Sequence, residues 1–247
     1  MNKKLVILIA IALLALGTFF FLGSVLGSAV TSAVNTIAPQ VTGTKVTLDS
    51  ALISPFNGTG SLNELYVGNP EGFSDGKAFS CGKVHVDARI SSVLSDTIVI
   101  EEIIIQAPEF IYETKLTSSN IGKILDNVNK FAGSSEPAKQ ESASTKKIEI
   151  KRFVLEGAVV SVSAAGMTMP VPVPRMEITD IGTAKGGVLP AEAAAEVLKR
   201  VLASVSQAAV TAIAKDPAKF GKDAEDAVKK LGSGLKGLLE KKEEPKP

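Results

Sequence analysis

Few residues of the kind that performs chemistry occur in this chain of 247 residues. His85 is the only histidine, and its alternation with Val84 and Val86 places it on the solvent side of a strand, without a second His or Cys nearby to share a metal ion. Cys81 is the only cysteine, so no disulfide can form within the chain. We interpret it as a small buried residue, the alternative being a thiol for an intermolecular disulfide.

The acidic and hydroxyl residues show no catalytic arrangement either. Glu101 and Glu102 are adjacent on an expected strand, so they point to opposite faces and do not form a carboxylate pair. The tripeptide 57–59 has the spacing of a glycosylation site, but its Asn-Gly pair is also a preferred hairpin turn. The formal charge of +1 offers no field for nucleic acid. We therefore predict no catalytic, cofactor-binding or metal-binding residue and no enzymatic activity.

The N-terminal segment is the strongest signal in the sequence. Lys3 and Lys4 precede an uncharged apolar stretch from Leu5 to Leu26, which as a helix spans roughly 33 Å, enough to cross a hydrocarbon core of about 30 Å. It is longer than the apolar region of a secretory signal, which favours an uncleaved transmembrane anchor over residues 1–27. The small residues 27–29 leave cleavage as an alternative. The two lysines hold the N-terminus in the cytoplasm and export the rest, with residues 28–42 as a linker.

The exported part is predicted to be rich in strands. Alternation or β-rich composition indicates strands over residues 45–49, 61–67, 84–90, 96–106 and 109–116. Three stretches share a pattern of two alternating apolar pairs separated by two residues: 46–53, 98–105 and 148–155. The gap reverses the phase of alternation, as a β-bulge would. The spacing of about 50 residues indicates a repeated β unit, with chance similarity among Ile- and Val-rich strands as the alternative.

Alternating prolines at 170, 172 and 174 remove backbone donors from one edge of a strand only. They predict an edge strand that cannot pair with a further strand on its open side, with a polyproline-like loop as the alternative. The strand over residues 96–106 is apolar on both faces. Its second face is expected either to be covered by helices or to line a groove for acyl chains, and the candidate lining residues are Ile98, Ile100, Ile103 and Ile105.

Helices are expected on both sides of the later strands. Ser118 and Ser119 can cap an amphipathic helix that ends near Gly133, and a second apolar periodicity begins at Pro190. The expected fold class is α+β: an N-terminal transmembrane helix, a twisted antiparallel β-sheet or groove with flanking helices, and a helical C-terminus. The expected units are a β-rich extracytoplasmic domain over 43–189 with a flexible loop at 133–147, C-terminal helices over 190–240, and a disordered tail over 241–247.

Several segments together carry a resemblance to a known family. They are Gly43–Leu48 after the anchor, Gly60–Leu62, Leu65–Phe73 with its Asn-Pro-x-Gly-Phe element, Val84–Leu94, Ile98–Phe110, Asn120-Ile121 and, later, Ile178–Gly182. In this order they resemble the AsmA-like family of membrane-anchored periplasmic proteins. The Asn-Pro-x-Gly-Phe element is moderately specific, the remainder is pattern, and about half of the chain is covered.

The resemblance implies a groove-like periplasmic fold on a single-pass anchor in a bacterial inner membrane. It also implies a non-catalytic role in envelope lipid transport or outer-membrane biogenesis. Expected partners are the membrane, phospholipid acyl chains and an envelope protein, but no nucleic acid and no cofactor. The chain is much shorter than the large members of the family, so bridging two membranes is not expected. The alternative is an interaction module whose C-terminal helices bind a partner protein or lie along the membrane surface.

Overall fold

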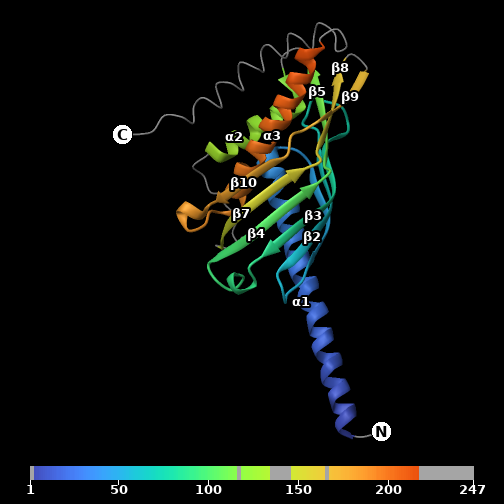
Figure 1. Ribbon diagram of the computed structural model, residues 1–247, viewed down its shortest axis with the longest axis vertical. Coiled ribbons are helices and arrows are strands. Elements are labelled where there is room, and N and C mark those ends of the chain that lie inside the picture. The colour runs from blue at the N-terminus through green and yellow to red at the C-terminus, as the bar shows by residue number, and fades with distance from the viewer. Residues whose placement is uncertain (1–2, 116–117, 134–145, 165–166, 217–247) are drawn as a thin grey trace.

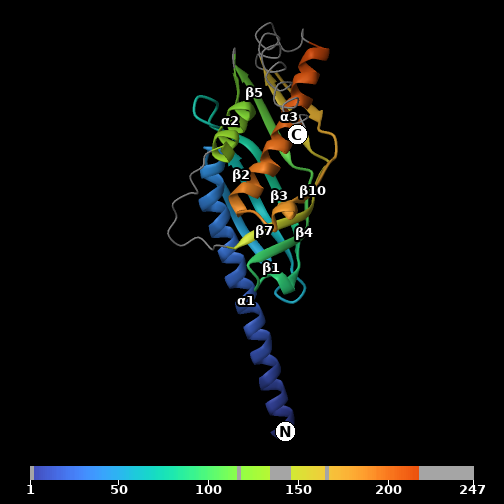
Figure 2. The ribbon, with the colours of Figure 1, turned by 90° about the vertical axis from the view of Figure 1, so that its left-hand side faces the viewer.

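The computed structural model describes residues 3–115, 118–133, 146–164 and 167–216, and the side chains among them from residue 22 onward except at 133, 164 and 167. The architecture is α+β, a mixed sheet with helices over one of its faces (Figures 1 and 2). Nearly all of the predicted loop at 133–147, the second C-terminal helix and the tail at 241–247 lie outside the described residues.

The elements follow one another in a simple order. The helices are α1 (Lys3–Thr42), α2 (Asn120–Gly133) and α3 (Pro190–Lys215). The strands are β1 (Val46–Ile53), β2 (Thr59–Gly68), β3 (Lys77–Ala88), β4 (Thr97–Gln106), β5 (Glu109–Lys115), β6 (Ser118–Ser119), β7 (Lys147–Glu156), β8 (Val159–Ala164), β9 (Met167–Pro172) and β10 (Met176–Ile181). Short 3-10 helices follow β3 at Ile90–Ser92 and β10 at Thr183–Lys185.

Helix α1 is one unbroken helix, and its second half lies along β1 while its first half projects beyond the sheet (Figure 1). The prediction of a linker over residues 28–42 was therefore wrong. The small and apolar residues there pack on the domain, and Val41 is completely buried in the core. Packing of an apolar helix face outweighs the modest helix propensity of a Ser/Thr/Val-rich segment. The folded unit accordingly begins on α1 rather than at residue 43.

Three pairs of strands in the sheet each form one long bent strand: β4 with β5, β7 with β8, and β10 with β9. Strand β3 pairs with β2 on one side and with both β4 and β5 on the other, because β4 and β5 form one strand bent at Ala107-Pro108. The strand β7–β8 bends beside it at Gly157-Ala158, and the bends are joined by a bond from the Ala107 N–H to the Glu156 carbonyl. Antiparallel β10 and β9 form the third, pairing with β7 and β8.

The sheet is mixed, which corrects the prediction that it is antiparallel. Strands β4 and β5 pair in parallel with β7 and β8, because the chain returns between them through α2. The second and third copies of the predicted repeat thus lie side by side: residue 98 faces residue 148, 103 faces 153 and 110 faces 160. The first copy forms β1 and pairs antiparallel with β2.

The predicted phase reversal is present in each copy of the pattern. Asp87 of β3 pairs with Glu102 of β4, but the next residue, Ala88, pairs with Ile100. Glu101 is therefore the extra residue of a bulge on β4. Ile100 and Ile103, three positions apart, consequently both pack against the core. The same spacing brings two residues to the core side in the other copies. These pairs are Leu48 with Ala51, and Ile150 with Phe153.

The proline-rich strand is an edge strand, as the first of the two interpretations predicted. Strand β9 lies at the end of the sheet and pairs only with β8 among the described strands. The Val173 N–H donates to the Ala158 carbonyl, so the N–H groups of the alternate residues point inward. Pro170 and Pro172 therefore occupy the positions whose donors would face the open edge.

Helices α2 and α3 cover the sheet and complete the core. The Ser119 hydroxyl accepts a bond from the Gly122 N–H, which is the predicted cap of α2, and Ile121, Ile124, Leu125 and Val128 are buried beneath it. Within the described side chains, α3 is the one helix long and apolar enough to cross a membrane. Because Val201, Leu202, Val205 and Ala209 are buried in the core, we assign α3 to the domain interior.

Candidate functional site

The four residues predicted to line a groove lie on the helix side of β4. Ile100, Ile103 and Ile105 pack against the hydrophobic core, and all four, including Ile98, are half-buried. Contact with the core agrees with the first of the two alternatives for this strand, a face covered by helices, and the lining of a lipid groove by these residues stays a prediction. The second face of β4 carries the half-buried Val99 and Ile104. In the described part of the chain, ion pairs rather than a helix lie beside them. These ion pairs are Arg89–Glu101, Arg152–Glu102 and Arg152–Glu177.

The other singled-out residues have structural surroundings. Cys81 is buried and its thiol donates to the Lys83 carbonyl at 3.2 Å. Burial raises the pKa of the Cys81 thiol above its ordinary value, and the nearby Glu64 carboxylate adds to the rise. His85 is exposed on the outer face, as predicted.

The contact between α1 and β1 forms the best-defined candidate site. Gly27 approaches the strand so closely that a Cβ there would lie 2.1 Å from the Ala51 carbonyl oxygen. Asn35 closes the edge further along: its side-chain oxygen accepts from the Leu48 N–H at 2.6 Å and its amide donates to the Leu48 carbonyl at 3.1 Å. Helix α1 therefore covers the free edge of β1 through backbone contact and one side-chain amide.

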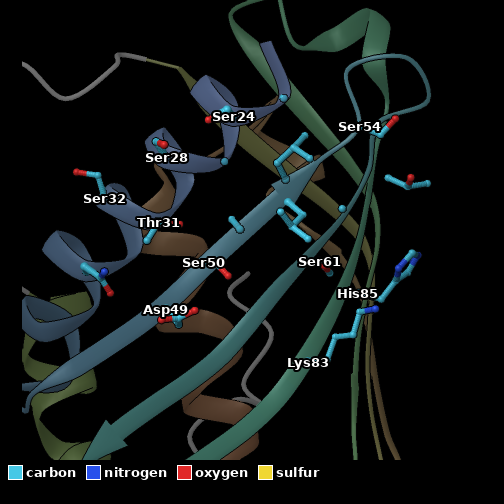
Figure 3. A pocket seen from close by; sticks show the side chains of 18 residues that line it. Ser24, Ser28, Thr31, Ser32, Asp49, Ser50, Ser54, Ser61, Lys83 and His85 are labelled. Atoms are coloured by element: carbon cyan, nitrogen blue, oxygen red, sulfur yellow. The ribbon is translucent and has the colours of Figure 1, made fainter. Parts of the chain in front are cut away.

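Beside this contact lies a groove of about 910 Å³, which we call the α1–β1 groove (Figure 3). One wall is α1, from Gly23 to Asn35, and the opposite wall is formed by Lys83 and His85 of β3. Strands β1 and β2 lie between them. The lining residues are Gly23, Ser24, Gly27, Ser28, Thr31, Ser32, Asn35, Asp49–Ser54, Thr59–Ser61, Lys83 and His85.

The chemical character of the α1–β1 groove changes along its length. In the orientation of Figure 1, its lower end, beside Gly23, has the apolar residues Leu52 and Ile53, and its upper end, beside Asn35, has Asp49 and Lys83. Hydroxyl groups of α1 line it throughout, among them those labelled at Ser24, Ser28 and Ser32 in Figure 3. Hydroxyls and an ammonium group bind phosphate oxygens, whereas the lower end suits a hydrocarbon chain.

The groove does not assemble a catalytic centre among the residues that the structure describes. Ser61 and His85 are opposite one another across β2 and β3, but no hydrogen bond joins them there. Within the same residues, no group of three or more His, Cys, Asp or Glu side chains is placed to hold a metal ion.

Sequence reasoning missed this site because it assigned residues 28–42 to a linker. The missed signal was the recurrence of small and hydroxyl residues at helical spacing: Gly23, Gly27 and Thr31, with Ser24, Ser28 and Ser32 beside them. Such a stripe permits the close backbone approach that β1 exploits.

A second set of contacts joins segments on which the family resemblance rests. The Asn120 amide donates to the Asn69 side chain at 2.7 Å and to the Ile111 carbonyl at 2.8 Å. Its oxygen accepts from the N–H groups of Glu113 and Ile121. The Asn-Pro-x-Gly-Phe element is thereby tied to the start of α2. No family model, curated protein or solved structure matches the chain. The AsmA-like resemblance stays a prediction.

Proposed function

We propose that this chain is a membrane-anchored, non-enzymatic envelope protein that holds a phospholipid in the α1–β1 groove. The lipid phosphate would lie near Lys83 and the hydroxyl groups of the upper groove. An acyl chain would run past Leu52 and Ile53 toward the bilayer. The observation that carries the proposal is the position of the groove. The apolar end of the groove lies where α1 leaves the domain and where the uncharged N-terminal stretch of α1 begins.

The wider role follows from the family resemblance. A groove of about 910 Å³ is of the size that binds one small ligand, which suits transient handling of single lipids. In this proposal the first half of α1 spans a bacterial inner membrane with its N-terminus in the cytoplasm. The domain then stands in the periplasm and serves envelope lipid transport or outer-membrane biogenesis.

The alternative role, an interaction module working through C-terminal helices, has less support. The apolar face of α3 is buried against the sheet and α2, so it is not available to a partner. Such a role would depend on residues 217–247, which lie outside the described part of the chain.

Site-specific photo-crosslinking tests the lipid proposal in the full chain. A photoreactive residue replaces Ser32, which lines the groove, or Ala33, which is exposed on the next helical position outside it. We expect a phospholipid adduct by mass spectrometry from position 32 and little from position 33. Equal yields from the two positions would contradict a lipid in the groove.

Blocking the groove provides a matched control. In the chain with the probe at position 32, Ser28→Phe places a ring in the groove, whereas Ala29→Phe places it on exposed helix surface. We expect Ser28→Phe to lower the adduct yield at least about tenfold, since the ring occupies the binding volume, and Ala29→Phe to leave it unchanged. An adduct that persists in the Ser28→Phe variant would arise from bulk lipid and would oppose the proposal.

A further inference from the structure

One end of the domain collects the exposed apolar side chains. The large hydrophobic residues that are exposed among the described side chains are Leu22, Val25, Leu52, Phe56, Ile90, Leu94 and Leu189. Strands β1, β3 and β10 end there, and β2, β4, β7 and α3 begin there. Figures 1 and 2 show this end of the sheet beside the point where α1 continues outward. We call it the basal surface.

Each tip of the basal surface carries one large, highly exposed apolar side chain among small polar residues, and Lys146 bonds to the Val93 carbonyl of the second tip. Phe56, in the β1–β2 hairpin, is 75% exposed, and Leu94, in the β3–β4 connection, is 93% exposed. The tip segments 54–58 and 90–95 contain no charged residue. Scattered exposed hydrophobic residues are normal on a soluble surface, but their concentration at one end marks a contact surface.

The geometry of α1 identifies the partner. Gly23 lies against the Ile53 carbonyl and Pro55, so Phe56 stands level with the neighbouring turn of α1. The uncharged stretch from Leu5 to Val25 is about 32 Å long as a helix, close to the roughly 30 Å of a hydrocarbon core. If α1 spans the bilayer, its boundary falls at Leu22–Val25, the level of the hairpin tip.

We infer that the basal surface inserts Phe56 and Leu94 into the interfacial layer of the membrane that α1 crosses. The inference rests on the proposed anchoring by α1. Because α1 is continuous and its second half packs on β1, the domain cannot swing away on a linker. The insertion gives the domain a second membrane contact and places the apolar end of the α1–β1 groove at the bilayer surface.

Tryptophan fluorescence tests the inference directly, because the chain contains no tryptophan. Phe56→Trp and Leu94→Trp each place one indole on the basal surface of the full chain. Phe73→Trp is the matched control, since Phe73 lies in the β2–β3 connection at the opposite end of the sheet. Each variant is reconstituted into phosphatidylcholine vesicles containing lipids brominated near the glycerol end of the acyl chain.

We expect the emission from positions 56 and 94 to shift to shorter wavelength and to be quenched at least about twofold, with position 73 unaffected. Equal behaviour of all three, in chains that float with the vesicles, would overturn basal insertion while leaving the anchor intact. Failure of the chains to float with vesicles would overturn the anchor and the proposed function, and the inference with it.

Discussion

At the scale of single residues, two side-chain amides, Asn35 and the buried Asn120, connect parts of the chain that are distant in sequence. Asn35 satisfies both backbone groups of Leu48 on an otherwise unpaired strand edge. Asn120 is completely buried and bonds to three backbone groups and to the Asn69 side chain. A buried polar group without its partner costs far more than the bond itself contributes, so the groups around Asn120 require its amide.

Replacing Asn120 by alanine should therefore destabilise the domain strongly. The change leaves the N–H groups of Glu113 and Ile121 and the Ile111 carbonyl without this partner, at a cost of about 2–4 kcal/mol in the free energy of unfolding. Chemical denaturation monitored by circular dichroism measures the change. Asn129→Ala, at a half-exposed position of the same helix, is the control and should cost under about 0.5 kcal/mol. Equal effects of the two variants would show that the network contributes little.

At the scale of elements, the two ends of the sheet are closed by different means. Strand β1 is covered by α1, whereas β9 exposes an edge from which prolines have removed the donors. Both features hinder the addition of a further strand to the sheet.

The contact at Gly27 can be tested by adding a single methyl group. Alanine favours a helix by about 1 kcal/mol over glycine, yet the Cβ of Gly27→Ala would collide with the Ala51 carbonyl. We expect a net loss of about 1–3 kcal/mol in the free energy of unfolding and faster amide exchange along β1. Ser28→Ala, one position away and exposed, should be neutral or slightly stabilising. A stabilised Gly27→Ala variant would mean that α1 and β1 are not in close contact.

The guarding role of the prolines predicts association when they are removed. Pro170→Val with Pro172→Val restores two backbone donors on the open edge of β9. Each new inter-chain hydrogen bond is worth about 0.5–1.5 kcal/mol, and a symmetric edge-to-edge pair gains up to about four of them, so dimers should appear in light scattering at roughly millimolar concentration. Thr168→Val raises the strand propensity of β9 without changing its donors and should remain like the parent chain. A doubly substituted chain with unchanged mass would show that the prolines do not guard this edge.

At the scale of the whole molecule, the two halves of α1 differ in their contacts with the domain. Its second half supplies a core residue, Val41, and closes the β1 edge, while its first half projects beyond the domain (Figure 1). The boundary between the two roles falls near Leu22, where the helix meets the basal surface.

Truncation at two points should separate these roles. A chain beginning at residue 22 should fold with a free energy of unfolding within about 1 kcal/mol of the full chain and no longer float with vesicles. A chain beginning at residue 43 should lose the domain, because the β1 edge and part of the core become exposed. Circular dichroism and vesicle flotation measure the two effects. If the second truncation were as stable as the first, the second half of α1 would be a linker after all.

Much of the local structure could be predicted from the sequence. Alternation located the strands, the two-residue gap at 101–102 indicated the bulge, and Ser119 marked the start of α2, because these signals depend on neighbouring residues alone. The prolines of β9 likewise determined on which side that strand could pair.

Long-range contacts decided the rest. The helical state of residues 28–42 depends on a strand edge that the local sequence does not reveal, and so does the α1–β1 groove. The parallel pairing of β4 with β7 depends on the return of the chain through α2. Placement of Ile100, Ile103 and Ile105 toward the core depends on which face the helices cover. Apolar periodicity shows that a face must be buried, but only the tertiary structure determines what buries it.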